Sequence, residues 1–159
     1  MRVYSTTFTQ AAAASATDIW ELTPAASQPI RIHRIIFTGI QTSSSNALIQ
    51  LIKRSTAATG GTQTTATIVD QGGFEAAVTL PTTSVKVYTA NPTTGTLVGI
   101  IRAVRFVIPA SNVTIAPTNL EFTFTDGLKL NPSEYLVMNL NGATLTGNSL
   151  TTNIEFSPL

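Results

Sequence analysis

The chain has 159 residues, of which 43% are hydrophobic and 11% are charged, and its net charge is +1. It contains one histidine, no cysteine and eight carboxylates, so it is poor in the groups that acid–base, nucleophilic and metal chemistry require. This composition favours a structural protein over an enzyme, excludes disulfides, and provides neither a basic stripe for nucleic acid nor an apolar run of about 18–20 residues for a membrane helix.

Short segments rich in Thr, Val and Ile, in which apolar and polar residues alternate, predict β-strands along the whole chain. The first two strands flank the alanine-rich residues 11–14, for which a helix is the competing prediction. Residues 30–40 form the longest early strand, and residues 47–53 are its expected hairpin partner. The predicted strands span residues 3–9, 18–22, 30–40, 47–53, 85–87, 97–108, 120–125, 128–130, 134–140 and 152–156.

A long exposed loop is predicted near residues 55–71, because this segment is rich in Thr, Ala and Gly and contains the pair Gly60-Gly61. Residues 68–80 are ambiguous, and a short helix around residues 74–78 is an alternative there. Further along, Asp126-Gly127 is predicted to be a tight turn that ends one strand before the next resumes.

About eight to ten short strands at fairly even spacing, with no repeat of 20–50 residues, predict a single all-β domain over residues 1–159. We expect a β-sandwich of jelly-roll-like architecture. The low charge also predicts that part of its surface is buried in an oligomer or a larger assembly, because monomers usually stay soluble with more charge than this.

His33, the only imidazole, lies between Arg31 and Arg34 in the primary sequence. Strand geometry places Arg31 and His33 on one face and Arg34 on the other, so the three are expected to be split. One histidine cannot supply a protein metal site or a triad, and a strand end or a subunit contact is its expected role.

Asp18 and Glu21 are three residues apart, a spacing that puts them on opposite faces of a strand and argues against a local acid–base pair. A glycosidase needs two carboxylates about 5–10 Å apart, which only the fold can reveal. We therefore predict no catalytic, cofactor-binding or metal-binding residue and no cofactor.

Arg102 and Arg105 interrupt the apolar segment 97–108 and lie on opposite faces by parity. Pairing within the chain to Glu121 or Glu155 and contact with another subunit are equally weighted explanations, because an unpaired buried charge would be costly.

Three aromatic residues support a second hypothesis, that of a carbohydrate-binding or host-adhesion module. Trp20, Tyr88 and Tyr135 could stack on sugars, which requires that they be exposed in one groove. Packing in a core or an interface is the more common role of a single tryptophan in a strand.

Four segments of the chain stand in a distinctive order. They are MRVYS at 1–5, QPIRIH at 28–33, LIKR at 51–54 and LKLNPSEYLV at 128–137. This order resembles that of small tailed-bacteriophage structural proteins that decorate or cement the capsid. In that group an N-terminal strand leads to a P-[IV]-R-I-H strand, an I-K-R strand end, a variable loop and a late P-G/S-E-x-L-V strand. Here Ser133 stands where glycine is common.

The resemblance implies a β-sandwich or jelly-roll protein, assembled in the host cytoplasm, that sits on the outer surface of the phage head where capsomers meet. The implied partners are the major capsid protein and further copies of the chain in a homotrimer, with no nucleic acid and no membrane. Arg2, Tyr4, Arg102 and Arg105 are the candidate assembly contacts. A head-fibre or tail component is the alternative within a virion, since a fold does not determine function.

Overall fold

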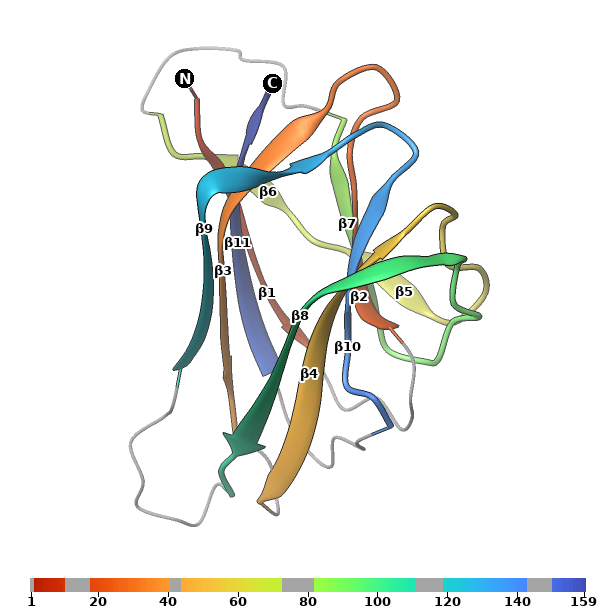
Figure 1. Ribbon diagram of the computed structural model, residues 1–159, viewed down its shortest axis with the longest axis vertical. Coiled ribbons are helices and arrows are strands. Elements are labelled where there is room, and N and C mark those ends of the chain that lie inside the picture. The colour runs from red at the N-terminus through yellow and green to blue at the C-terminus, as the bar shows by residue number, and fades with distance from the viewer. Residues whose placement is uncertain (1, 11–17, 41–43, 73–81, 111–118, 143–149) are drawn as a thin grey trace.

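The computed structural model describes residues 2–10, 18–40, 44–72, 82–110, 119–142 and 150–159. Within them, two antiparallel sheets pack as a sandwich, which confirms the predicted fold class (Figure 1). Sheet A has the strand order β6-β1-β11-β3-β9, and sheet B has the order β5-β7-β2-β10-β4-β8. The strands are β1 (Tyr4–Gln10), β2 (Asp18–Thr23), β3 (Ile30–Gly39), β4 (Ser45–Arg54), β5 (Gln63–Thr65), β6 (Ile68–Asp70), β7 (Ser84–Tyr88), β8 (Leu97–Ile108), β9 (Asn119–Leu130), β10 (Tyr135–Asn139) and β11 (Leu150–Pro158).

The strand order is that of a jelly roll. Strands β1-β11-β3-β9 form one sheet and β2-β10-β4-β8 the other, so the chain repeatedly crosses from sheet to sheet. The hairpin predicted between residues 30–40 and 47–53 is therefore wrong, because β3 lies between β11 and β9 whereas β4 lies between β10 and β8.

The segment predicted as a long loop near residues 55–71 contains two strands of three residues each. β5 pairs with β7 at one edge of sheet B, and β6 pairs with β1 at one edge of sheet A. The loop prediction is wrong at these positions, because strands this short make little hydrophobic pattern of their own. The alternatives of a helix at residues 11–14 and at residues 74–78 lie outside the described residues.

Asp126-Gly127 does not end a strand, as the turn prediction required. β9 continues through this pair and stays beside β3, with a register shift between Ile32 and Arg34 of β3. Gly127 has a φ of 72°, which favours glycine, and β9 bends sharply along its course (Figure 1). A bulge therefore replaces the predicted turn.

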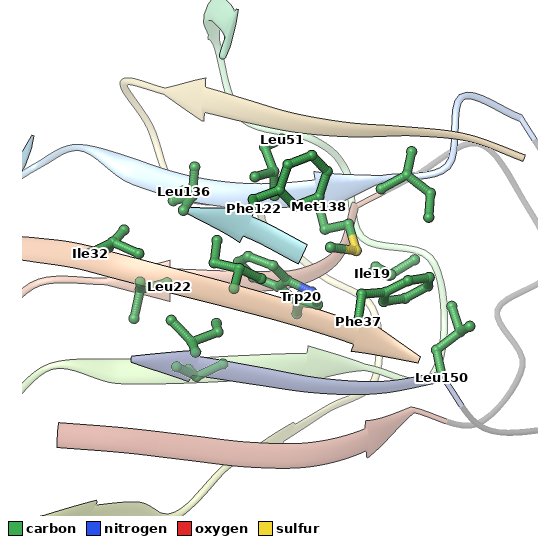
Figure 2. Packing of buried hydrophobic residues seen from close by; sticks show 14 of the residues in the cluster. Ile19, Trp20, Leu22, Ile32, Phe37, Leu51, Phe122, Leu136, Met138 and Leu150 are labelled. Carbon is green, nitrogen blue, oxygen red and sulfur yellow. The ribbon is translucent and has the colours of Figure 1, made fainter. Parts of the chain in front are cut away.

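The core fills the space between the two sheets. Side chains from both sheets, among them Trp20, Phe37 and Met138, gather there with no solvent exposure (Figure 2). The ring of Phe37 on β3 meets that of Phe106 on β8 edge to face, with centroids 5.5 Å apart. Burial of each large apolar side chain stabilises the fold by about 1.5–3 kcal/mol.

Candidate assembly surface

β8 is an edge strand with an apolar, solvent-exposed face. It pairs with β4 on one side only, so the backbone groups of its other side have no strand partner among the described residues. Four of the seven exposed large hydrophobic residues in the described part of the chain lie on this strand. They are Leu97, Val98, Ile100 and Val107, each 52% to 58% exposed.

The register with β4 shows which face carries these side chains. Leu97, Ile100 and Val107 lie opposite Arg54, Ile52 and Asn46, on the outer face of sheet B. The sequence did not predict that these side chains are exposed. An apolar segment with two arginines predicts a strand but does not show which of its faces is exposed to solvent. The positions of the arginines were the available signal, since charges in an apolar strand indicate incomplete burial.

β9 ends sheet A at the same side of the sandwich. Arg102 on β8 lies over the ring of Phe124 on β9, with 5.8 Å between the guanidinium carbon and the ring centroid, and this contact joins the two edges. Both strands have twelve residues. We call the unpaired edges of β8 and β9, together with the exposed β8 side chains, the β8–β9 side.

The other side of the sandwich ends differently. The edge strands there, β5 and β6, have three residues each. Short edge strands are one way in which proteins prevent pairing with other chains, and the long β8 lacks that protection. The β8–β9 side is therefore the candidate assembly surface.

The two β8 arginines belong to this surface. Arg102 lies opposite Leu51 and Arg105 opposite Leu48, so they point to opposite faces of the sheet as predicted, and both are exposed. Of the two equally weighted explanations, pairing with Glu121 or Glu155 is wrong, because both carboxylates pair with Arg34, at 3.9 Å and 2.7 Å.

The other two candidate contacts lie elsewhere. Arg2 forms an ion pair with Asp70, at 3.5 Å, next to β6 and far from β8 in the strand order. Tyr4 is 3% exposed and stacks on Phe156 with ring centroids 5.9 Å apart. The Tyr4 ring belongs to the core, because its alternation with Thr6 and Phe8 places it on the inner face of β1. It is not available as an assembly contact.

The aromatic groove required by the carbohydrate hypothesis is not formed by the predicted residues. Trp20 and Tyr88 are buried, at 0% and 1% exposure, and only Tyr135 is partly exposed. Stacking on these three rings is therefore excluded in this conformation.

Asp18 and Glu21 share the outer face of sheet B, contrary to the prediction. A register shift in β2 places Asp18 opposite Asn139 and Glu21 opposite Val137, two residues that alternate onto the same face of β10. Each carboxylate is buried and bonded. Arg54 donates two hydrogen bonds to Asp18, at 2.7 Å and 2.8 Å, and the Ala58 N–H donates one to Glu21 at 2.7 Å.

His33 lies in mid-strand, so the strand-end role is wrong. The pairing of β3 with β9 and with β11 skips His33, so this residue forms a β-bulge. The extra residue shifts the alternation of side chains, and Arg31 and Arg34 therefore lie on the same outer face of sheet A. The predicted split of this cluster is therefore wrong too. Arg31 and His33, with Thr125 and Asp126 of β9, line a pocket of about 480 Å³.

The described residues hold no group of three or more His, Cys, Asp or Glu side chains arranged for a metal ion. No helix long and apolar enough to cross a membrane occurs in the described part of the chain. By its strand order the protein is a jelly-roll β-sandwich. Comparison with known proteins found no matching family model, no matching curated protein and no matching solved structure.

Proposed function

We propose that this chain is a structural protein of a tailed-bacteriophage virion, of the capsid decoration type, and that it assembles through its β8–β9 side. The observation that carries the assembly role is the edge strand β8, whose Leu97, Ile100 and Val107 are each more than half exposed. A long apolar edge favours pairing with another chain, and proteins that stay monomeric normally guard against it.

The phage setting of this proposal rests on the sequence segments alone. They imply the major capsid protein and further copies of this chain, in a homotrimer, as partners on the outer surface of the head. The jelly-roll order agrees with that implication, but many unrelated proteins share the fold, so the location is proposed from the resemblance.

The mechanism is physical. A partner strand added along β8 satisfies backbone groups that water now solvates, and the exposed β8 side chains add apolar burial of about 25 cal/mol per Å². Repetition of this contact around a capsid turns a modest single affinity into strong retention. Only 11% of the residues are charged, which limits the charges that assembly must desolvate; on this surface they include Arg102 and Arg105.

Lysine substitutions on the two edges test the proposal. Val107→Lys and Ile100→Lys introduce a charge on β8, whereas Val69→Lys places the same charge on β6, where Val69 is 56% exposed. In co-sedimentation with undecorated heads, we expect the wild type and V69K to bind and both β8 variants to lose at least about tenfold in affinity. Thermal melts verify that all variants are folded.

Two outcomes contradict the proposal. No co-sedimentation of the folded wild type with heads contradicts the decoration role, and equal binding by V107K, I100K and V69K contradicts the β8–β9 side as the contact. Size-exclusion chromatography with light scattering tests self-association separately, where a monomer at high concentration contradicts the trimer.

A further inference from the structure

The pocket on the outer face of sheet A is built by two bulges that face each other. Ile32 pairs with Leu128 and Arg34 with Thr123, so His33 on β3 and residues 124–127 on β9 stand outside the ladder. The extra length of β9 raises Thr125 and Asp126 above the sheet, where they form one wall of the pocket. Bulges of this kind commonly reorient side chains at binding sites.

Gly127 positions the arginine of this pocket. A Cβ at residue 127 would collide with Cγ and Cδ of Arg31, so glycine allows the Arg31 stem to pack directly against β9. His33 is held from the other side by a hydrogen bond of 2.9 Å between its Nε2 and the Ser157 hydroxyl. The pocket therefore has a preformed backbone and two oriented side chains.

No described residue pairs with the two charged side chains of the pocket, Arg31 and Asp126. Arg31 makes no hydrogen bond or ion pair with any described residue, and its Nε is shielded from solvent without a partner. Asp126 has no bonded partner among the described residues either, and the two do not pair with each other. By contrast, Arg34 on the same face bonds Glu155 at 2.7 Å. A guanidinium and a carboxylate that line one pocket without pairing to each other favour a ligand that has a partner for each.

We propose that this pocket binds an acidic sugar unit, with the sugar carboxylate on Arg31 and its hydroxyl groups on Asp126 and Thr125. A guanidinium presents parallel N–H donors that match a carboxylate, and an ionised Asp126 accepts hydrogen bonds from hydroxyl groups. The four lining residues are all polar, which suits a hydroxylated ligand, and the pocket volume is within the range of small-molecule sites.

The charge of the pocket selects among small anions. The charges of Arg31 and Asp126 nearly cancel. Asp126 repels a phosphate, which has close to two negative charges, more strongly than a singly charged carboxylate, and a sugar also brings hydroxyl donors to Asp126. A metal ion is disfavoured because the Arg31 guanidinium lies in the same pocket. A zwitterion such as glycine satisfies both charges but leaves the hydroxyl of Thr125 and the His33 ring without a ligand group.

This site goes beyond the proposed function and does not depend on it. The pocket is on sheet A and uses no side chain of β8, so loss of sugar binding and loss of head binding are separate results.

Titration of the ¹⁵N-labelled protein with D-glucuronate, followed by NMR, tests the proposal. We expect saturable shifts at the Arg31 side chain and the Gly127 amide, with a Kd on the order of 1 mM. Glucose, inorganic phosphate and glycine, at the same concentrations, are expected to bind at least about tenfold more weakly.

Variants assign the binding to the named groups. Arg31→Gln and Asp126→Asn are each expected to weaken glucuronate binding at least about tenfold. Arg31→Lys should give an intermediate loss of affinity, because lysine keeps the positive charge but lacks the parallel N–H donors of the guanidinium. Lys129→Gln is the matched control, since Lys129 lies opposite Arg31 on β9 but does not line the pocket, and it should change Kd less than about twofold. Absence of saturable shifts, equal binding of glucose, phosphate or glycine, or unchanged Kd in D126N would overturn the proposal.

Discussion

On the outer face of sheet B, the side chains of Asp18 and Glu21 have no solvent exposure, whereas on the outer face of sheet A the ion pair of Arg34 with Glu155 stays partly in water, at 39% and 20% exposure. The difference comes from what lies above each sheet. Residues 55–62 and 89–96 cover the part of sheet B where Asp18, Glu21 and Arg54 lie, and they are joined by reciprocal backbone hydrogen bonds between Thr59 and Thr93. Sheet A has no such cover among the described residues.

The comparison indicates that the charges on sheet B stabilise the fold, whereas some charges on sheet A are available to a ligand. Buried charges need complete sets of partners, and the Ala58 N–H and the Gly95 carbonyl supply part of those sets from within the cover itself. The cover and the charges therefore depend on each other for stability. On sheet A, Arg31 is half-buried and Asp126 is exposed, so apart from the shielded Arg31 Nε the charges that have no partner among the described residues remain in contact with water and available to a ligand.

The largest effect is expected from Asp18→Asn. This change leaves the Arg54 guanidinium, whose side chain is 8% exposed, without its counter-charge, and should lower the free energy of unfolding by about 3–5 kcal/mol. Urea denaturation followed by circular dichroism measures it. Asp18→Leu with Arg54→Met removes both charges and should recover most of the loss, whereas a loss below 1 kcal/mol in the single variant would contradict a buried pair.

A smaller effect is expected from Gly95→Ala, which tests the cover. A Cβ on Gly95 would collide with the backbone oxygen of Thr56, so the two covering segments must separate, at a cost of about 1–3 kcal/mol. Gly99→Ala is the matched control, because a Cβ there has nothing within 4 Å, and it should change stability by less than about 0.5 kcal/mol. Equal melting temperatures for the two variants would show that the cover does not hold sheet B closed.

Glu155→Gln, on the open face, is expected to cost at most about 1 kcal/mol. The hydrogen bond and the charge of Glu155 raise the pKa of Arg34, but both side chains are partly exposed, so water and salt screen the pair. Denaturation at low and high NaCl separates the two faces: the E155Q effect should vanish at 1 M salt and the D18N effect should persist. A salt-resistant loss in E155Q would place this pair with the buried ones.

Sequence patterning predicted nearly every strand but not the bulge at His33, because Ile35 and Ile36 are both apolar and either phase of alternation fits them. In β3 the buried residues are Ile30 and Ile32, then Ile35 and Phe37, so the inward positions change from even to odd numbers at His33. A change of parity within one strand requires an extra residue in the ladder. The same reading explains how Arg31 and Arg34 come to share a face.

Other features depend on contacts distant in the sequence. The burial of Asp18 and Glu21 requires the cover, whose residues follow by about 40 and 75 positions, and no local pattern encodes that contact. The exposure of Val107 follows from the place of β8 at the end of its sheet. Alternation predicts a strand, but only the strand order determines whether a further strand lies beside it.

The smallest effect at neutral pH, and the most specific, is expected from Tyr88→Phe. Tyr88 follows Lys86 by two residues on β7, on the covered face, and its hydroxyl is buried without a partner among the described residues. Loss of that hydroxyl removes no hydrogen bond, so the free energy of unfolding at pH 7 should change by less than about 0.5 kcal/mol or rise slightly.

Alkaline pH should separate the variant from the wild type. Burial, reinforced by the charges of Glu21 and Asp18, raises the pKa of Tyr88 in the folded protein well above its value of about 10 in the unfolded chain. The unfolded state therefore releases the proton first, and this residue lowers wild-type stability as pH rises above about 10, by up to about 1.4 kcal/mol per pH unit. Denaturation at pH 8 to 11 should show that slope in the wild type and in the control Tyr135→Phe, but reduced in Y88F. Equal slopes in all three would mean that water reaches the Tyr88 hydroxyl and that the cover over sheet B is open in solution.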